Sequence, residues 1–256
     1  MRSTILVLLM GCCVILSCQL QPESLDKPEI SIREDVVLQL DQSLSSSGSS
    51  LGFTFTSSLA NQCQGTKYRH QSIVTPGEVS IHLISLQMPD PCIGSEANAT
   101  QKIAITPHSG LYDLEIDLGD NIHNTGTLLI DDESFQIDMN TVYGLSIPHY
   151  SMVRIPSGMI WGYLYHPVKQ QEAMEIVNSI LDITIEEPTL DQGYYGHFMI
   201  ANNGQVTVPS LNLNSASFIY KFNSTAAVLS DLATQIRAEL PGGTDFRLFT
   251  WLGSEY

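Results

Sequence analysis

Between about residue 35 and residue 156 the chain alternates apolar and polar residues, and this period of two constrains the fold more than any other feature. Val79–Ile84 and Tyr112–Leu118 alternate, and turn-rich segments such as Pro89-Asp90-Pro91 separate these runs. A period of two places apolar side chains on one face of a strand, and short strands between such turns are typical of a sandwich. We therefore predict an antiparallel β-sandwich domain over residues 35–156.

A serine-rich segment lies between two of the expected strands. Val36–Leu40 precedes Ser43–Ser50 (SLSSSGSS), and the alternating run Leu51–Thr56 follows it. Polar low-complexity segments are typical of loops. We predict a long hairpin loop here, with the end of a linker as the alternative.

The pattern changes after residue 157, where expected strands and helices follow one another in the order β-α-β-β-α-β. This is the order of a ferredoxin-like domain, which we predict as an α+β part over residues 157–256; an extra strand at Ile183–Ile185 would change that topology. The expected strands are Met159–Tyr165, Tyr194–Ala201, Ala216–Phe222 and Asp245–Leu252, and the expected helices are Lys169–Asp182 and Thr225–Glu239.

Both expected helices carry an apolar stripe at helical spacing. Asn223 or Ser224 can cap the second helix, and Leu240-Pro241-Gly242-Gly243 ends it. The residues expected to face the core are Ala173, Ile176, Val177, Ile180 and Leu181 in the first helix, and Val228, Leu232 and Ile236 in the second.

The first eighteen residues predict export. Arg2 is followed by the apolar run Ile5–Leu16. A helix that spans a membrane needs ~20 residues, so this run is too short to do so, and it fits the apolar core of a signal peptide. Ile15-Leu16-Ser17-Cys18 resembles the lipobox of bacterial lipoproteins; Leu9-Met10-Gly11-Cys12 is a second match that leaves a shorter apolar run. An ordinary secretory signal and a membrane anchor are the alternatives.

The resemblance to lipoproteins implies a signal peptide over residues 1–17, acyl chains on Cys18, and a lipid-anchored protein of the bacterial outer membrane, periplasmic or surface-exposed. The membrane is then a partner through the anchor. Residues 18–34 are predicted to be a lipidated tether, because the segment is polar and contains Pro22 and Pro28.

The five cysteines agree with export. Cys12 and Cys13 leave with the signal peptide and Cys18 carries lipid, so Cys63 and Cys92 remain. An even pair in an oxidising compartment predicts a disulfide. Two unpaired buried thiols are the alternative.

The charge balance excludes one class of function. The chain has 11 Lys and Arg against 27 Asp and Glu, a formal charge of −16, and nucleic-acid binding depends on basic residues that neutralise phosphates. No zinc-protease motif, phosphate loop or dinucleotide fingerprint is present. Catalytic groups also assemble across a fold, so an enzyme is not excluded, but nothing in the sequence points to one.

Three carboxylates alternate along one expected strand. Asp113, Glu115 and Asp117 share a face, ~6.6 Å apart, with Asp120 nearby. Carboxylate oxygens bind Ca²⁺, so these residues are a candidate metal site. A solvated face of an acidic protein is the alternative, and no other cofactor is expected.

Aromatic residues gather in the first two strands expected after residue 157. Trp161, Tyr163 and Tyr165 share one face of their strand, as do Tyr195 and His197 of the next. On an exposed face these rings could stack on a sugar or bind a partner protein. Their alternative role is to fill the core.

Ser109–Ile116 resembles the G-x-Y-x-L-x-I strand of prealbumin-like and Ig-like surface domains, and these domains commonly bind ligands or partners at cell surfaces. We therefore expect a non-enzymatic binding or structural module whose partner is a glycan or another envelope component. The alternatives are an envelope hydrolase with a carboxylate-based site, and a subunit of a surface assembly that pairs by its strand edges.

Overall fold

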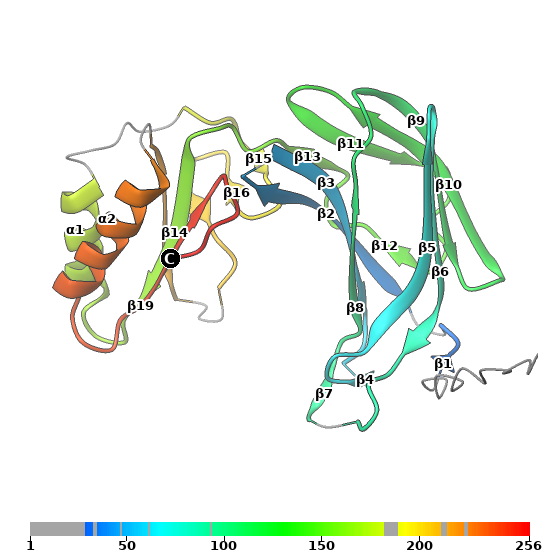
Figure 1. Ribbon diagram of the computed structural model, residues 1–256, viewed down its shortest axis with the longest axis horizontal. Helices are drawn as coiled ribbons and strands as arrows, with labels where there is room; N and C mark the ends of the chain where they lie inside the picture. Colours follow the sequence, from blue (N-terminus) through cyan, green and yellow to red (C-terminus); the bar gives the residue numbers. More distant parts are fainter. Residues whose placement is uncertain are drawn as a thin grey trace, which may run out of the picture.

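The computed structural model describes residues 29–32, 35–46, 48–60, 62–92, 94–181, 189–210, 214–222 and 225–256. The expected signal peptide, Cys18 and the tether up to residue 28 lie outside these residues. The protein is mainly β with two helices in its second half (Figure 1). The prediction of a mainly β chain with an α+β C-terminal part is therefore confirmed at this level.

The strands of the first half form two large sheets and a separate two-stranded sheet of β4 and β7. These strands are β1 (Glu29–Ile30), β2 (Val36–Ser45), β3 (Gly48–Ser57), β4 (Gln62–Cys63), β5 (Lys67–Thr75), β6 (Glu78–Gln87), β7 (Glu96–Ala97), β8 (Thr100–Ile105), β9 (Gly110–Leu118), β10 (Ile122–Ile130), β11 (Ser134–Met139), β12 (Leu145–Ser146) and β13 (Ser151–Val153). The larger sheet has the order β1-β6-β9-β10-β11-β13 with β5 also paired to β6, and the smaller sheet has the order β12-β2-β3-β8. Pairing is antiparallel except between β6 and β9 and between β12 and β2.

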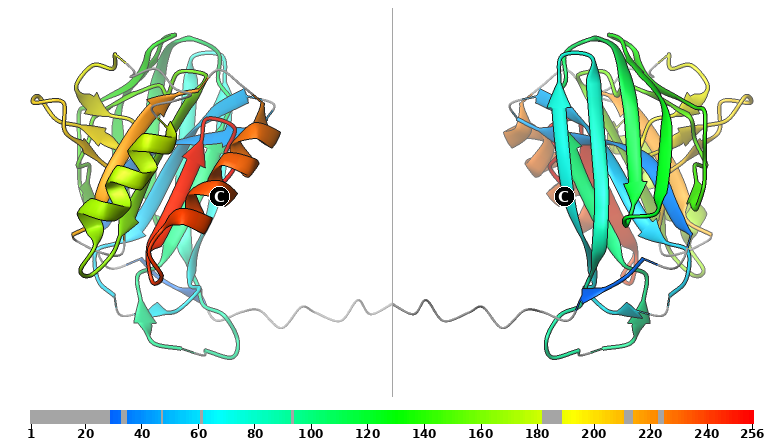
Figure 2. Two further views of the ribbon diagram at one scale, coloured as in Figure 1. Left: turned by 90° about the vertical axis from the view of Figure 1, so that its left-hand side faces the viewer. Right: turned by 90° about the vertical axis from the view of Figure 1, so that its right-hand side faces the viewer.

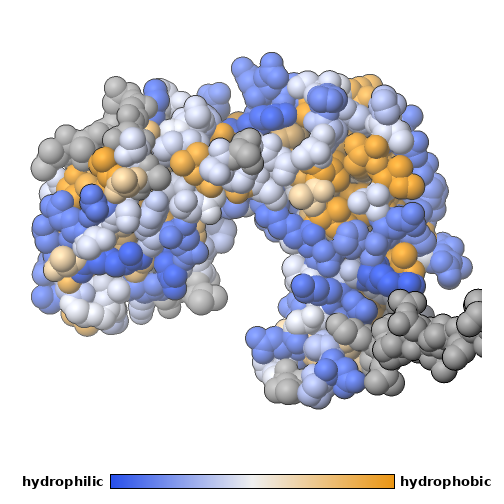
Figure 3. All heavy atoms as spheres, viewed as in Figure 1, coloured by the Kyte–Doolittle hydropathy of each residue, from blue (hydrophilic) through white to orange (hydrophobic). Residues whose placement is uncertain are grey.

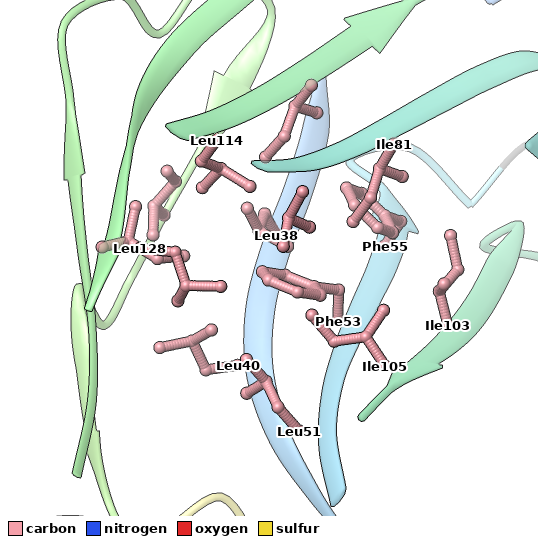
Figure 4. Packing of buried hydrophobic residues seen from close by; sticks show 14 of the residues in the cluster. Leu38, Leu40, Leu51, Phe53, Phe55, Ile81, Ile103, Ile105, Leu114 and Leu128 are labelled. Carbon is pink, nitrogen blue, oxygen red and sulfur yellow. The ribbon is translucent and has the colours of Figure 1, made fainter. Parts of the chain in front are cut away.

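The two sheets face each other across the largest hydrophobic cluster. Figure 4 shows side chains of the smaller sheet pointing toward those of β6, β9 and β10. Leu38 pairs with Phe55 and Leu40 with Phe53 across β2 and β3, and all four are fully buried. Burying one such side chain stabilises the fold by about 1.5–3 kcal/mol. The alternation predicted from the sequence is therefore the pattern that builds this core.

The serine-rich segment is strand rather than loop. The β2–β3 ladder continues through Ser43 opposite Ser50 to Ser45 opposite Gly48, so the prediction of a long hairpin loop is wrong. Tertiary packing outweighs the low strand propensity of these serines, because Leu44 packs against a hydrophobic cluster of the second half. A Cβ at Gly253 would lie 2.3 Å from the Leu44 carbonyl oxygen, which shows how closely the second half approaches the hairpin.

The structure corrects one prediction for the first half, at Glu29–Ile30, and confirms another, the disulfide. Glu29–Ile30, expected in the tether, forms β1 and pairs with β6. Cys63 and Cys92 form a disulfide with their Cα atoms 5.7 Å apart, so the predicted pairing is confirmed.

The second half has a three-stranded antiparallel sheet in the order β18-β14-β19. Its strands are β14 (Met159–Tyr165), β18 (Ala216–Lys221) and β19 (Asp245–Thr250), and its helices are α1 (Gln170–Leu181) and α2 (Ala226–Glu239). The helices cover one face of this sheet (Figure 1; Figure 2, left). Ile160 and Leu164 of β14 pack toward the helices, whereas Met159, Trp161 and Tyr163 belong to a separate cluster. Neither helix is long and apolar enough to cross a membrane.

The expected strand Tyr194–Ala201 is wrong as a single strand. It is broken at Gly196, whose φ is +80°, into β15 (Gly193–Tyr194) and β16 (Met199–Ile200), which join β17 (Val206–Thr207) in a small separate sheet. A left-handed glycine turns the chain back on itself. The second strand of the expected β-α-β-β-α-β order therefore does not lie in the sheet with β14.

The apolar stripe of α2 differs from the prediction at Val228, whereas Ile236 is buried and Leu232 packs against the same cluster, as predicted. Val228 is 41% exposed, and the buried residues are Leu229, Ala233 and Ile236. Leu229 takes the inward position because it stands four residues before Ala233 and seven before Ile236, one face of a helix. Thr225 is the N-cap residue and makes no side-chain capping bond, and Leu240 ends the helix as predicted. The predicted caps Asn223 and Ser224 and the possible strand Ile183–Ile185 lie outside the described residues.

Candidate binding pocket at the junction of the two halves

The end of the β2–β3 hairpin joins the two halves by hydrogen bonds. The Tyr194 hydroxyl donates to the Leu40 carbonyl oxygen at 2.9 Å and accepts from the Gln39 amide at 2.5 Å. Burial raises the pKa of Tyr194 to about 12, so the hydroxyl keeps its proton at neutral pH. His197 Nε2 lies 2.6 Å from the Gln42 carbonyl oxygen and donates to it in the tautomer protonated there. The turn between β15 and β16 is thus fixed to β2.

Gly196 permits this close approach. A Cβ at this position would lie 2.8 Å from Met152 Sδ and 3.2 Å from the Gln42 backbone nitrogen, and its positive φ is one that side chains rarely adopt. Residue 196 therefore has to be glycine for the halves to meet as they do.

The aromatic residues singled out from the sequence lie mostly in the core. Trp161, Tyr163 and Tyr195 are buried, and Tyr165 and His197 are partly buried. The Phe198 ring contacts both Trp161 and Tyr195, with centroids 5.3 and 4.7 Å apart. An exposed aromatic platform for a sugar is therefore not formed, because one face of the β14 sheet packs under the helices and the other under this cluster.

A cavity of about 380 Å³, here called the junction pocket, opens beside the hairpin. Small-molecule sites commonly measure ~300–1,000 Å³ and lie between domains. Its walls come from both halves and from the segment that connects them. They are Gln42, Ser49, Asp132, Glu133, Val153, Arg154, Ile155, Pro156, Thr189, Leu190, Asp191 and Tyr195.

Arg154 is the basic group of the junction pocket. Its guanidinium carbon lies 4.3 Å from the centroid of the Phe135 ring, and its Nε is buried without a hydrogen-bond partner. None of the described carboxylates forms an ion pair with it. A buried donor without a partner destabilises the fold by about 1–3 kcal/mol. The Phe135 ring thus holds this guanidinium in place, and its buried Nε–H is a donor without a partner.

Gln42 is a second donor at the same place. The side chain is 1% exposed, and its Oε1 accepts a hydrogen bond from the Ile155 backbone N–H at 2.8 Å. Its Nε2 has no partner among the described residues. Gln42 also borders a neighbouring cavity of about 290 Å³. A buried amide with one end engaged and the other open is well placed to orient a ligand.

Acidic side chains surround these donors. Asp132, Glu133 and Asp191 line the junction pocket and are exposed at its rim. The turn that carries the first two is fixed by Asp131, which accepts the N–H groups of Glu133 and Ser134 at 2.8 and 2.6 Å. These bonds hold the pKa of Asp131 below its ordinary value. The junction pocket therefore combines one cation with three carboxylates.

Tyr195 also lines the junction pocket. Its hydroxyl donates to the Asp191 carbonyl oxygen at 2.9 Å, and burial raises its pKa. This bond ties Asp191 to the aromatic cluster, so the third carboxylate stands on a fixed backbone.

The candidate calcium ligands do not form a metal site. Asp113, Glu115 and Asp117 share the outer face of β9 as predicted, but Asp117 Oδ1 lies 2.5 Å from His123 Nδ1 and pairs with it. Across the residues that the structure describes, no three His, Cys, Asp or Glu side chains are arranged to hold a metal ion. The carboxylates point outward from a strand at wide spacing, and the solvated acidic face is the interpretation that fits.

Sequence reasoning missed both Gln42 and Arg154. For Gln42 a signal existed, since the buried face of β2 runs Val36, Leu38, Leu40 and then Gln42, which puts an amide where the pattern demands an apolar residue. For Arg154 there was none, because its open donors depend on contacts across the fold. Comparisons of this chain with models of known families, with curated proteins and with solved structures find no significant match.

Proposed function

We propose that the protein is a lipid-anchored component of the bacterial cell envelope that binds a small zwitterionic ligand, one with a carboxylate and an ammonium group, in the junction pocket. In this proposal the first half is an Ig-like or prealbumin-like β-sandwich. The second half is a ferredoxin-like unit that lacks the second strand in its sheet. The first, third and fourth strands, β14, β18 and β19, keep the ferredoxin-like order β18-β14-β19.

The envelope location rests on the lipobox-like segment ending at Cys18 and is supported by the disulfide. Structural disulfides persist in oxidising compartments such as the periplasm or cell surface. Several acyl chains on one cysteine, each contributing ~0.8 kcal/mol per buried CH₂, would anchor the chain stably.

The ligand class follows from the charges of the junction pocket. The guanidinium of Arg154 offers paired donors that match a carboxylate, and the open amide of Gln42 can donate to the same group. Asp132, Glu133 and Asp191 leave the lining with a net negative charge, which disfavours dianions such as phosphate and favours an ammonium group. A molecule with both charges satisfies both parts of the site.

The Arg154 guanidinium, which lines the junction pocket and forms no ion pair with a described carboxylate, is the single observation that carries this proposal. A carboxylate-based hydrolase, the alternative, needs a carboxyl whose pKa is raised so that it can donate a proton. Asp131, the chain neighbour of the lining residue Asp132, instead has its pKa lowered by the N–H groups that it accepts.

Calorimetric titration of the full-length protein with L-lysine, glycine and acetate tests the proposal. We expect L-lysine and glycine to bind more tightly than acetate. Arg154→Met, which keeps the apolar stem against Phe135, should weaken binding by about 10- to 100-fold, the range for a hydrogen bond to a charged group. Arg247→Met is the matched control, because Arg247 pairs with Glu255 on the surface, and it should leave binding unchanged.

Two outcomes would overturn the proposal. One is the absence of heat with both zwitterions at millimolar concentration, and the other is equal affinity in the protein and its Arg154→Met variant. Thermal unfolding of each variant shows whether a loss of binding reflects a loss of structure.

A further inference from the structure

A strand edge of the larger sheet is open. β5 pairs with β6 along its whole length, and within the described residues no strand pairs with its other side (Figure 2, right). Edge strands present unpaired N–H and C=O groups that can pair with another chain, and proteins blunt them with charges, prolines or bulges. The question is therefore how far β5 is protected.

Only the first half of β5 is protected. Lys67 and Arg69 carry charge, and a bulge separates Arg69 from His70. The smaller sheet also approaches here, where the Thr100 N–H donates to the Thr66 carbonyl oxygen at 3.3 Å. The second half, Gln71 to Thr75, has no charge, no proline and no bulge, and all five residues are exposed.

The segment Gln71–Thr75 borders an opening between the two sheets of the first half of the protein. Val74 lies opposite the fully buried Val79 and therefore on the core side of the larger sheet, yet it is 41% exposed. A cavity of about 480 Å³ lies beside it, lined by Pro107, Leu111 and Tyr112 among others. Figure 3 shows an apolar area at the surface between the two sheets of this half. The core is thus uncovered along the unprotected part of the edge.

We propose that a second copy of this chain covers this edge, with β5 pairing antiparallel to β5 of the second copy about a two-fold axis at Ile73. Ser72 then lies opposite Val74 of the second copy on the core side, a small residue against a larger one. Ile73 lies opposite Ile73 of the second copy on the outer face, and Gln71 opposite Thr75. Two-fold pairing is the commonest closed arrangement of identical chains.

Charge complementarity selects this partner and register. β5 has two basic residues and no acidic one in a chain of net charge −16. In the proposed register Arg69 meets Gly77 of the second copy, next to its Glu78, so the basic end of each strand meets the acidic residue of the other hairpin.

Sedimentation velocity of the full-length protein in detergent, from about 10 µM to 1 mM, tests the pairing. We expect self-association that increases with protein concentration. Ile73→Lys should abolish it, because like charges then lie directly opposite each other. Leu129→Lys is the matched control: Leu129 is 39% exposed on β10, which has strands on both sides, and this variant should associate like the unmodified chain.

A mixture of two variants tests the register itself. Ile73→Lys and Ile73→Glu should each remain monomeric alone, and mixing them should restore dimers because opposite charges then face each other. If two chains merely shared one detergent micelle, each variant alone and the mixture would associate to the same extent. The proposal is wrong if the unmodified chain stays monomeric throughout, if Ile73→Lys associates normally, or if mixing restores nothing.

Discussion

Replacing Gln42 by alanine should destabilise the protein more than any change at an exposed glutamine. The side chain is 1% exposed, and its Oε1 is the acceptor for the Ile155 N–H. Leaving that N–H without a partner costs about 1–3 kcal/mol, and the lost buried methylene adds about 0.8 kcal/mol. We therefore expect the free energy of unfolding to fall by roughly 2–4 kcal/mol.

Gln42→Met separates the two contributions. Methionine has a similar length and fills the space, but it provides no comparable acceptor for the Ile155 N–H, so this variant should lose only the hydrogen-bond part, about 1–3 kcal/mol. Gln71→Ala, at an exposed position of β5, is the control and should change stability by less than about 0.5 kcal/mol.

Urea unfolding followed by tryptophan fluorescence measures these differences. With a slope of about 3 kcal/mol per molar urea, Gln42→Ala should move the midpoint down by roughly 0.7–1.3 M. Trp161, one of the two tryptophans, lies buried in the cluster next to the junction, so its emission follows this region. A shift of Gln42→Ala no larger than that of Gln71→Ala would refute the argument that the buried Gln42 amide stabilises the fold through the Ile155 N–H.

Three further predictions concern other parts of the chain. Intact mass of the protein from its native cells should show cleavage before Cys18 and acyl chains on it, and Cys18→Ala should release the protein from membranes; an unacylated native protein would contradict the lipoprotein assignment. Reducing the Cys63–Cys92 disulfide, which closes a loop with a sequence separation of 29, should lower the free energy of unfolding by about 3–4 kcal/mol, and an unchanged urea midpoint after reduction would count against it. The bond from Asp117 raises the pKa of His123 above 6.5, so this pair adds stability below pH 6.5 that is lost as pH rises through the raised pKa; NMR titration should show the pKa fall in Asp117→Asn, and no change would refute the pairing.

The sequence pattern predicted the strands whose position depends mainly on their own residues. The strands Val79–Ile84 and Tyr112–Leu118 lie within β6 and β9, because one buried face imposes a period of two. Met159–Tyr165 matches β14, which is buried on both faces. The errors occur where distant residues decide. Ser43–Ser45 and Gly48–Ser50 are strand because the second half packs against the end of the hairpin. Tyr194–Ala201 is broken because Gly196 turns the chain close to Met152.

The candidate site could not be predicted for the same reason. The Gln42–Ile155 bond joins residues 113 positions apart, and neither residue belongs to a recognisable motif. The aromatic residues drew attention through their parity, which correctly places Trp161 and Tyr163 on one face of β14. Parity does not tell what covers that face, and the small sheet that covers it is formed by the segment whose strand was wrongly predicted.

The open donors of the junction pocket and the open edge of β5 share one physical character. In each place a group that proteins normally satisfy has no partner among the described residues: the Nε–H of Arg154 in one, and the outer edge of β5 beside Val74 in the other. A lysine at Ile73 would protect the edge of β5. The two binding surfaces should be independent of each other. Substitutions at Ile73 should therefore leave zwitterion binding intact, and Arg154→Met should leave self-association intact. If either variant removed both properties, one shared structural defect would explain them, and two independent binding surfaces would not.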